Sequence, residues 1–275
     1  MVLEGRAPTV PKTQTKWSEK IYLKRIREGR GQGELENYKP WVTVQEIPSK
    51  GISARIPGEK THRLHHLFSR NEIAFFYLLE ANEDVLDIRE QYPLLDVLDT
   101  VRISEKAGIN HPRDPVSRYP YAFTSDFFIV TRSGIKVRSI KTYADLKNKR
   151  TLEKQEIERR YWEEAGYDWK IVTDTVIDFR KADNLAWLRM RVRCLQEMVS
   201  DREILTEAAW CFAECFKESV FPINVIAGDV EDLFGFEPGT GICVFAKTVL
   251  DRLIDIDLRR PFDMTAVRSR KGWAV

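Results

Sequence analysis

The sequence predicts an α/β fold in two parts: a mixed α/β domain over residues 1–178 and a mainly helical domain over residues 179–275. Two observations support this prediction. Short apolar or alternating runs of strand length recur before residue 174, whereas the later apolar residues recur mostly at helical spacing. A chain of 275 residues, of which 43% are hydrophobic, is also long enough to build a core in each part.

The first part is predicted to alternate between helices and strands. Residues 1–15 contain two prolines and are expected to form a flexible arm. The segments that follow are expected, in order, to be a helix over residues 17–27, a strand over 41–47, a helix beginning near Glu72, a strand over 85–92 and a loop-rich stretch over 96–122.

A hairpin is predicted next. Asp126 begins an apolar run over residues 127–130, which is typical of a buried strand, and residues 135–141 have the pattern of a second strand. Ser133 and Gly134 supply the turn between the two strands. A highly charged helix over residues 147–162 and a strand over 167–173 complete this part.

The second part is predicted to be helical. Residues 254–258 and 265–268, on either side of Pro261, are expected to pair as a small hairpin. Helices followed by such a two-stranded wing are typical of a winged-helix domain. The predicted helices cover residues 185–199, 202–216, 225–234 and 242–253.

Three residues of the first part form a candidate catalytic set. Glu72 lies near a helix start, with Ser69 as a possible N-cap, Asp126 opens a strand, and Lys141 ends the next strand. Two carboxylates can hold Mg²⁺ through hard oxygen ligands. A lysine beside them can orient a water or stabilise charge that develops at phosphorus. An ordinary buried salt bridge, or a set of solvated charges, would also fit these residues.

The environment of Lys141 refines this candidate site. Side chains alternate along a strand, so Ser139 and Lys141 share a face and the Ile140 side chain points away. We expect the main-chain carbonyl of Ile140 to face the same pocket and to act with Glu72 and Asp126 as a metal ligand.

Several long segments resemble the TnsA family, the endonuclease subunits of bacterial heteromeric cut-and-paste transposases. The resemblance covers most of residues 20–175 and keeps the segments in order, which makes it specific. The segments are residues 25–33, 41–46, 86–94, 151–154 and 158–162.

The resemblance implies a restriction-endonuclease-like fold for the N-terminal domain. It also implies a winged-helix-like C-terminal domain, over residues 179–275, that contacts DNA and partner proteins. By resemblance, Glu72, Asp126 and Lys141 fall on the catalytic positions, and Glu158 falls on a further acidic position. One departure concerns Ser139, because family members often carry glutamine there. A serine hydroxyl is shorter and a weaker ligand than an amide, so we expect a water to bridge Ser139 to the metal.

The resemblance also implies a function. It suggests a Mg²⁺-dependent DNA endonuclease, with Mn²⁺ as a substitute, that cuts the non-transferred strand of double-stranded DNA at transposon ends. A DDE transposase, TnsB, and an AAA+ ATPase, TnsC, would be its partners. The departure at Ser139 favours one alternative, a non-catalytic DNA-binding or assembly module that retains the nuclease fold. A generic restriction or repair nuclease is a third possibility.

Composition limits the remaining possibilities. The net charge is only +2, so DNA contact must come from local patches. The sequence has no apolar run of about 18 residues and no signal-peptide core, and we expect a bacterial cytoplasmic, DNA-associated protein. Candidate basic contacts are Arg102, Arg113 and Arg118, the ends of the helix over 147–162, and Arg189, Arg191 and Arg193.

Three further motifs leave alternatives open. Residues 29–33 are glycine-rich and suit a helix stop or a phosphate contact. His62, His65 and His66 could hold zinc, although a polar lip over the DNA backbone is the preferred interpretation. The four cysteines are expected to be buried free thiols rather than a zinc site: Cys194, Cys211, Cys215 and Cys243.

Overall fold

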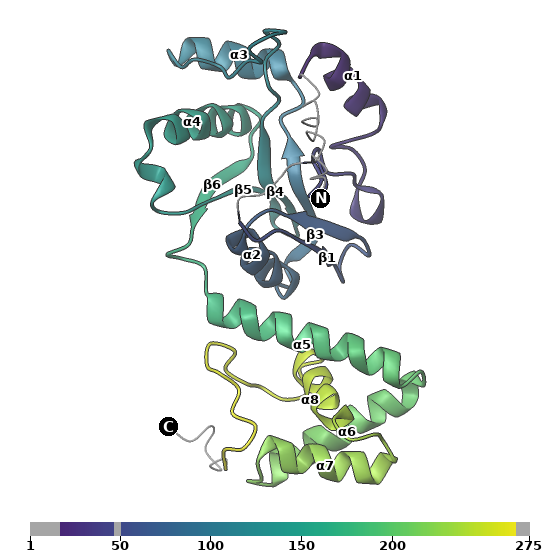
Figure 1. Cartoon of the computed structure of the whole chain (residues 1–275). Coiled ribbons are helices and arrows are strands. Elements are labelled where there is room, and N and C mark those ends of the chain that lie inside the picture. The colour runs from purple at the N-terminus through teal and green to yellow at the C-terminus, as the bar shows by residue number, and fades with distance from the viewer. Residues whose placement is uncertain (1–16, 47–50, 268–275) are drawn as a thin grey trace, which may run out of the picture. The chain divides into compact units, whose positions relative to one another are not determined.

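The computed structural model describes residues 17–46 and 51–267, and these divide into two compact units (Figure 1). The first unit contains the described residues up to Ser69 together with Asp84–Thr173. The second unit contains Arg70–Glu83 and the described residues from Asp174 onward. The mixed α/β class and the two-part organisation predicted from the sequence are therefore confirmed.

A four-stranded mixed sheet forms the centre of the first unit. Its strands are β3 (Val85–Pro93), β4 (Thr124–Thr131), β5 (Gly134–Lys141) and β6 (Asp168–Thr173), in that order. The pairs β3–β4 and β4–β5 are antiparallel, whereas β5 and β6 are parallel. The predicted hairpin is present, because β4 and β5 pair up to Thr131 opposite Gly134.

Helix α4 (Lys149–Glu164) makes the crossover from β5 to β6, as a parallel pair requires. Asn148 caps it by accepting from the amides of Arg150 and Thr151. The buried face of α4 presents Trp162, whose ring lies 5.7 Å from that of Phe128 on β4. This apolar cluster, which also contains Leu94 and Val137, packs α4 against the sheet. Helix α4 is drawn beside the strands of that sheet in Figure 1.

The remaining elements of the first unit are short. They are α1 (Glu19–Arg27), η1 (Leu35–Asn37), β1 (Ala54–Pro57), β2 (Leu64–Leu67), α3 (Val97–Lys106) and η2 (Asp145–Lys147). Strands β1 and β2 form a separate antiparallel pair.

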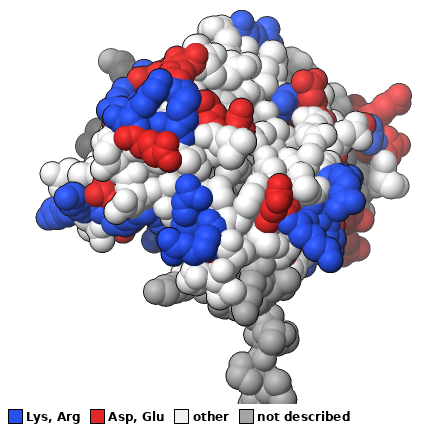
Figure 2. All heavy atoms as spheres, turned by 90° about the horizontal axis from the view of Figure 1, so that it is seen from above, with Lys and Arg blue, Asp and Glu red and all other residues white. Residues whose placement is uncertain are grey.

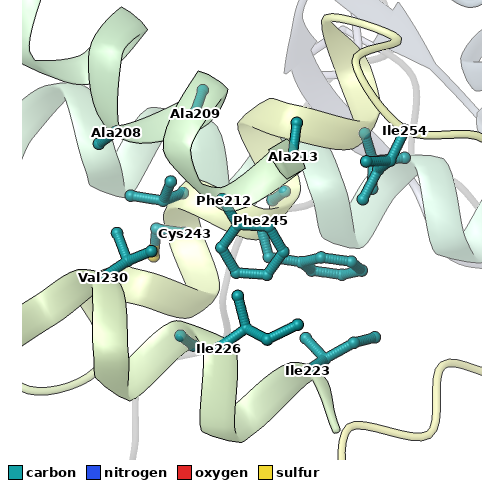
Figure 3. Close-up of a cluster of buried hydrophobic side chains, with 14 of the residues drawn as sticks. Ala208, Ala209, Phe212, Ala213, Ile223, Ile226, Val230, Cys243, Phe245 and Ile254 are labelled. Carbon is teal, nitrogen blue, oxygen red and sulfur yellow. The ribbon is translucent and has the colours of Figure 1, made fainter. Parts of the chain in front are cut away.

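Helices are the only regular secondary structure among the described residues of the second unit. Its helices are α2 (Arg70–Glu80), α5 (Phe179–Met198), α6 (Arg202–Glu218), α7 (Ile223–Phe234) and α8 (Thr240–Leu250). Phe212, Phe245 and Ile226 are fully buried at the centre of their common core (Figure 3). None of the helices described is long and apolar enough to cross a bilayer.

One close approach explains a glycine in this core. A Cβ atom added to Gly241 would lie 2.1 Å from the carbonyl oxygen of Ala227. Helix α8 therefore passes α7 at a separation that only glycine permits at this position.

Two elements differ from the sequence prediction in the first unit. Residues 41–46 form turns rather than a strand, and Ile47 lies outside the described residues. Apolar and polar residues alternate in this segment because some side chains of the loop are buried, and Trp41 is only 2% exposed. The Trp41 amide donates one hydrogen bond, to the carbonyl oxygen of Gln91. The stretch over 96–122 contains helix α3, which Asp96 caps through the amide of Asp99.

The predicted wing is also wrong for the residues described. Residues 254–267 form turns and bends with no strand, while Arg268 lies outside the described part. Ile254 and Ile256 instead bury their side chains in the helical core. The Asp263 carboxylate accepts bonds from the amides of Thr265 and Ala266, and such local bonds compete with strand pairing.

The division into units also differs from a single cut at residue 178. Residues 70–83 belong to the second unit, where Glu80 on α2 forms an ion pair with Arg189 on α5. Arg70 adds a cation–π contact over the ring of Phe179 at 5.3 Å. Tertiary packing, which chain order does not reveal, assigns α2 to the helical unit.

Candidate active site

Asp126 and Lys141 meet at the end of the β4–β5 pair. In this register Phe127 lies opposite Arg138, which brings Asp126 close to the last residues of β5. The Asp126 Oδ2 atom accepts a hydrogen bond from the Ile140 amide at 2.6 Å and an ion-pair contact from Lys141 Nζ at 2.8 Å. Both side chains are only partly exposed, at 15% for Asp126 and 25% for Lys141.

The Lys141 ammonium group contacts a second oxygen. Nζ also donates to the main-chain carbonyl of Ile140 at 2.8 Å. A positive charge therefore lies against one carboxylate oxygen and one carbonyl oxygen, the two kinds of hard ligand that a divalent cation uses. The positively charged Lys141 side chain therefore contacts two of the oxygens that we expect to bind the metal ion.

Glu158 forms the buried wall behind this pair. It lies on α4 and is 2% exposed. Burial raises the pKa of the Glu158 carboxyl, the positive charge of Lys141 opposes that rise, and the negative charge of Asp126 adds to it. Four side chains donate to the carboxylate: Ser125 at 2.7 Å, Trp169 at 3.0 Å, Gln155 at 3.2 Å and Ser139 at 3.3 Å.

Ser139 connects the two acids. Its hydroxyl lies 3.4 Å from Asp126 Oδ2 and 3.3 Å from Glu158 Oε2. Both distances are at the long limit for a hydroxyl donor, for which 2.7–2.8 Å is usual. Ser139 is therefore a weak link between the carboxylates, although it is only 1% exposed.

Glu72 lies in the second unit. It is the third residue of α2, as the predicted helix start requires, and it is 6% exposed. The structure brings Asp126, Ile140 and Lys141 together within the first unit. The sharing of one site by Glu72 and Asp126 stays a prediction.

The donor set suits a hard cation better than zinc. The described residues contain no group of three or more His, Cys, Asp and Glu side chains able to hold a metal ion. Mg²⁺ does not need such a group, because it keeps several waters and often binds through one or two carboxylates. Asp126 and the Ile140 carbonyl are the oxygens in the first unit that could hold it.

The histidines do not form a zinc site. His65 is fully buried, with one ring nitrogen 2.7 Å from Thr61 Oγ1 and the other 2.7 Å from Glu90 Oε2. His66 Nδ1 accepts from the Val44 amide at 3.2 Å. The predicted polar lip is therefore wrong for His65, which no DNA backbone can reach.

The four cysteines are free thiols, as predicted, but the predicted burial is confirmed only for Cys243. Cys243 is buried and the other three are half-buried within the helical unit. Burial raises the pKa of the Cys243 thiol, which is therefore a poor metal ligand and nucleophile.

The glycine-rich segment is a helix stop. Gly29 lies just past the end of α1, where it has positive φ and its amide donates to Ile26 O. Gly31 and Gly33, which also have positive φ, continue the turn. Arg30 forms ion pairs with Glu46 at 2.7 Å and Glu28 at 2.9 Å. These partners hold the one arginine that the phosphate-binding alternative needed.

Several of the other candidate DNA contacts are paired with acids. Arg102 contacts Asp99 at 2.6 Å, and Glu156 holds both Arg159 at 2.8 Å and Arg160 at 2.6 Å. On the face drawn in Figure 2, basic side chains form separate groups that alternate with acidic and uncharged surface. That face carries no single large basic patch.

Sequence reasoning missed the other partners of Glu158. Gln155 precedes Glu158 by three residues on α4, so helical spacing alone places both side chains on one face. Ser125 and Trp169 come from β4 and β6, and only the folded sheet brings them to the helix.

The first unit is a restriction-endonuclease-like α/β domain. Its mixed sheet carries Asp126 and Lys141 on adjacent strands, and the helix that covers the sheet carries the buried acid Glu158. The TnsA-like endonuclease N-terminal family matches residues 82–174, and the TnsA endonuclease C-terminal family matches residues 177–258. The chain belongs to the TnsA endonuclease family. The N-terminal match includes Asp126 and Lys141 but begins after Glu72.

One curated relative is the transposon Tn7 transposition protein TnsA of Escherichia coli. It is 43% identical over 180 residues, which cover 64% of this chain and 65% of the relative. The alignment therefore spans just under two thirds of that protein's length.

Proposed function

We propose that this chain is the DNA endonuclease subunit of a Tn7-like cut-and-paste transposase and hydrolyses the non-transferred strand at transposon ends. The observation that carries the proposal is the contact of Lys141 with Asp126. The Lys141 ammonium group lies 2.8 Å from both Asp126 Oδ2 and Ile140 O. An acid and a lysine in contact at the end of adjacent strands suit phosphodiester hydrolysis. The relative's role in Tn7 transposition supports the biological setting.

Mg²⁺ is the proposed cofactor, with Mn²⁺ as a substitute. Glu72, Asp126 and the Ile140 carbonyl would hold it. When bound, the ion would activate a water and stabilise negative charge at phosphorus. Nζ of Lys141, freed from one oxygen, would orient that water or donate to a phosphate oxygen.

Asp126 is held for this role by its surroundings. The Ile140 amide donates to Oδ2 at 2.6 Å, which fixes the carboxylate against the end of β5. That oxygen accepts all three of the contacts made by Ser139, Ile140 and Lys141, and none of these reaches Oδ1.

The proposed partners are double-stranded transposon-end DNA, a DDE transposase of the TnsB type and an AAA+ ATPase of the TnsC type. The transposase would cut and join the other strand. A bacterial cytoplasmic, DNA-associated location accords with this role.

The test is a reconstituted cleavage reaction with each DNA strand labelled separately. We expect the natural chain, with its transposase and ATPase, to cut both strands at the transposon end. Asp126→Ala should leave the transferred strand cut and the other intact. Glu105→Gln, which changes an exposed acid on α3, is the control for altered charge.

Two results would reject the proposal. Equal cleavage of the non-transferred strand by Asp126→Ala would remove this site from the chemistry. A natural chain that assembles on the ends, supports cutting of one strand and never cuts the other would favour the non-catalytic assembly module.

A further inference from the structure

Gln155 places an amide in the wall of the Glu158 cluster. The residue is 7% exposed, and its Nε2 atom donates to Glu158 Oε2 at 3.2 Å. Its Oε1 atom is buried and has no hydrogen-bond partner among the described residues. A buried carbonyl oxygen without a donor carries a cost in free energy, and folded proteins rarely leave one unsatisfied.

The orientation of this amide follows from its neighbour. The Gln155 Nε2 atom donates to Glu158 Oε2, and an ionised carboxylate can only accept hydrogen bonds, so in that form of Glu158 the NH₂ end of Gln155 faces it. Rotating the amide by half a turn would set two oxygens against each other. While Glu158 is ionised, Oε1 is therefore the end of the Gln155 amide that lacks a hydrogen-bond partner among the described residues.

The same carboxylate oxygen receives the Ser139 hydroxyl. Glu158 Oε2 lies 3.2 Å from the Gln155 amide and 3.3 Å from Ser139 Oγ, which in turn lies 3.4 Å from Asp126 Oδ2. A line of contacts thus runs from α4 to the Asp126–Lys141 pair. At Glu158 a short hydroxyl from β5 therefore meets a long amide side chain from α4.

We propose that Gln155 is a positioning residue of the cation site and supplies from α4 the amide that position 139 lacks. Its Nε2 group holds the Glu158 carboxylate in place. Its Oε1 atom accepts a hydrogen bond from the hydration shell of the divalent cation held at Asp126. This inference rests on the proposed function, because it requires that a cation binds there.

The test measures Mn²⁺ affinity of the full chain by calorimetry without DNA. Gln155→Met keeps the length of the side chain and removes the amide. We expect Gln155→Met to weaken Mn²⁺ binding by about tenfold or more. Removing a residue that hydrogen-bonds to the metal's ligands typically weakens metal binding by about 10- to 100-fold. The double variant Ser139→Gln with Gln155→Met should recover the natural affinity, because the amide then returns from the strand.

Gln196→Met is the matched control. It makes the same chemical change at an exposed helical position of the second unit and should leave Mn²⁺ affinity unchanged. Each variant is first melted in EDTA, so that loss of fold is distinguished from loss of binding. Gln155→Leu replaces Gln155→Met if the latter does not fold.

The outcomes separate this inference from the proposed function. Natural affinity in a folded Gln155→Met chain overturns the inference while the cation site stands. A natural chain that does not bind Mn²⁺, or an Asp126→Asn chain that binds it equally well, rejects the cation site itself. Ser139→Gln alone gives an independent check: a full tenfold gain would show that Gln155 does not supply the amide, and little change supports the inference.

Discussion

The ammonium nitrogen of Lys141 lies 2.8 Å from Oδ2 of Asp126 and the same distance from the carbonyl oxygen of Ile140. One flexible side chain therefore satisfies two oxygens that are also suited to a divalent cation. A metal ion that used both oxygens would have to displace the ammonium group, because two positive charges at such a distance repel.

This competition leads to the first prediction. Lys141→Met should bind Mn²⁺ more tightly than the natural chain, since no ammonium then opposes the ion at Asp126. Cleavage by the same variant should fall by about a hundredfold or more, because a donor that stabilises the transition state is lost. Calorimetry and single-turnover cleavage measure the two effects.

The control for this prediction is Lys170→Met on β6. Lys170 is exposed and contacts Asp168 at 3.5 Å, so its loss removes one positive charge from the same sheet without touching Asp126. Weaker Mn²⁺ binding by Lys141→Met would show that the lysine helps to hold the cation site together.

The second prediction concerns Ser139. Its hydroxyl makes two long contacts, and Glu158 keeps three other donors when that hydroxyl is removed. Ser139→Ala should therefore slow cleavage by no more than about tenfold, or about 1.4 kcal/mol of barrier. A loss of several hundredfold in single-turnover reactions would show that the hydroxyl takes a direct part.

The third prediction concerns Glu90, which is fully buried between Arg63 and His65. Arg63 Nη2 lies 2.6 Å and His65 Nδ1 2.7 Å from Glu90 Oε2. Glu90→Gln should lower the free energy of unfolding by about 3–5 kcal/mol, because it leaves Arg63 buried without its counter-charge. Urea denaturation measures this loss, and Glu36→Gln, at an exposed position of the same unit, is the control.

The same residue predicts a pH dependence. Burial alone would raise the pKa of Glu90, but the charges and hydrogen bonds of His65 and Arg63 outweigh it and place the pKa well below its ordinary value of 4.5. The stability that Glu90 gains from Arg63 and His65 should therefore be complete above about pH 4.5 and decline as the pH falls below that value. A difference between natural and Glu90→Gln chains that grows on acidification would contradict this assignment.

The fourth prediction concerns α2. Its buried residues Ala74, Phe76 and Leu79 belong to the second unit, where α2 packs with α5. A chain that ends at residue 178 loses α5, so it should melt several degrees below the natural chain. For a domain of this size, each kcal/mol of lost stability lowers the melting temperature by about 2–4 °C. A chain that ends at residue 267 is the control, and equal melting temperatures for the two would show that α2 does not need its helical partners.

The fifth prediction concerns DNA. Steep salt dependence requires about six to ten phosphate contacts, whereas Arg102, Arg159 and Arg160 are paired with acids. The isolated chain should bind end-containing and scrambled duplexes equally, with a dissociation constant of about a micromolar or weaker at physiological salt. Nanomolar, end-specific binding in a fluorescence titration would show a recognition surface within this chain alone.

The sequence alone was sufficient for the hairpin and its two functional residues. The apolar run after Asp126, the Ser133–Gly134 turn and the alternation up to Lys141 are local signals, and pairing in the expected register follows from them. The sites of most helices were also predictable, because the spacing of apolar residues reports one buried face. The strand over 41–47 and the wing were mispredicted, since alternation describes burial and does not supply a pairing partner.

Tertiary structure decided which residues share a neighbourhood. The four donors around Glu158 come from β4, β5, β6 and α4. Likewise α2 precedes the main sheet in the chain yet belongs to the helical unit. Local sequence determines the conformation of a segment through its own hydrogen bonds and periodicity, whereas long-range packing determines which segments meet, because only the folded chain can bury a charge and provide all of its partners at once.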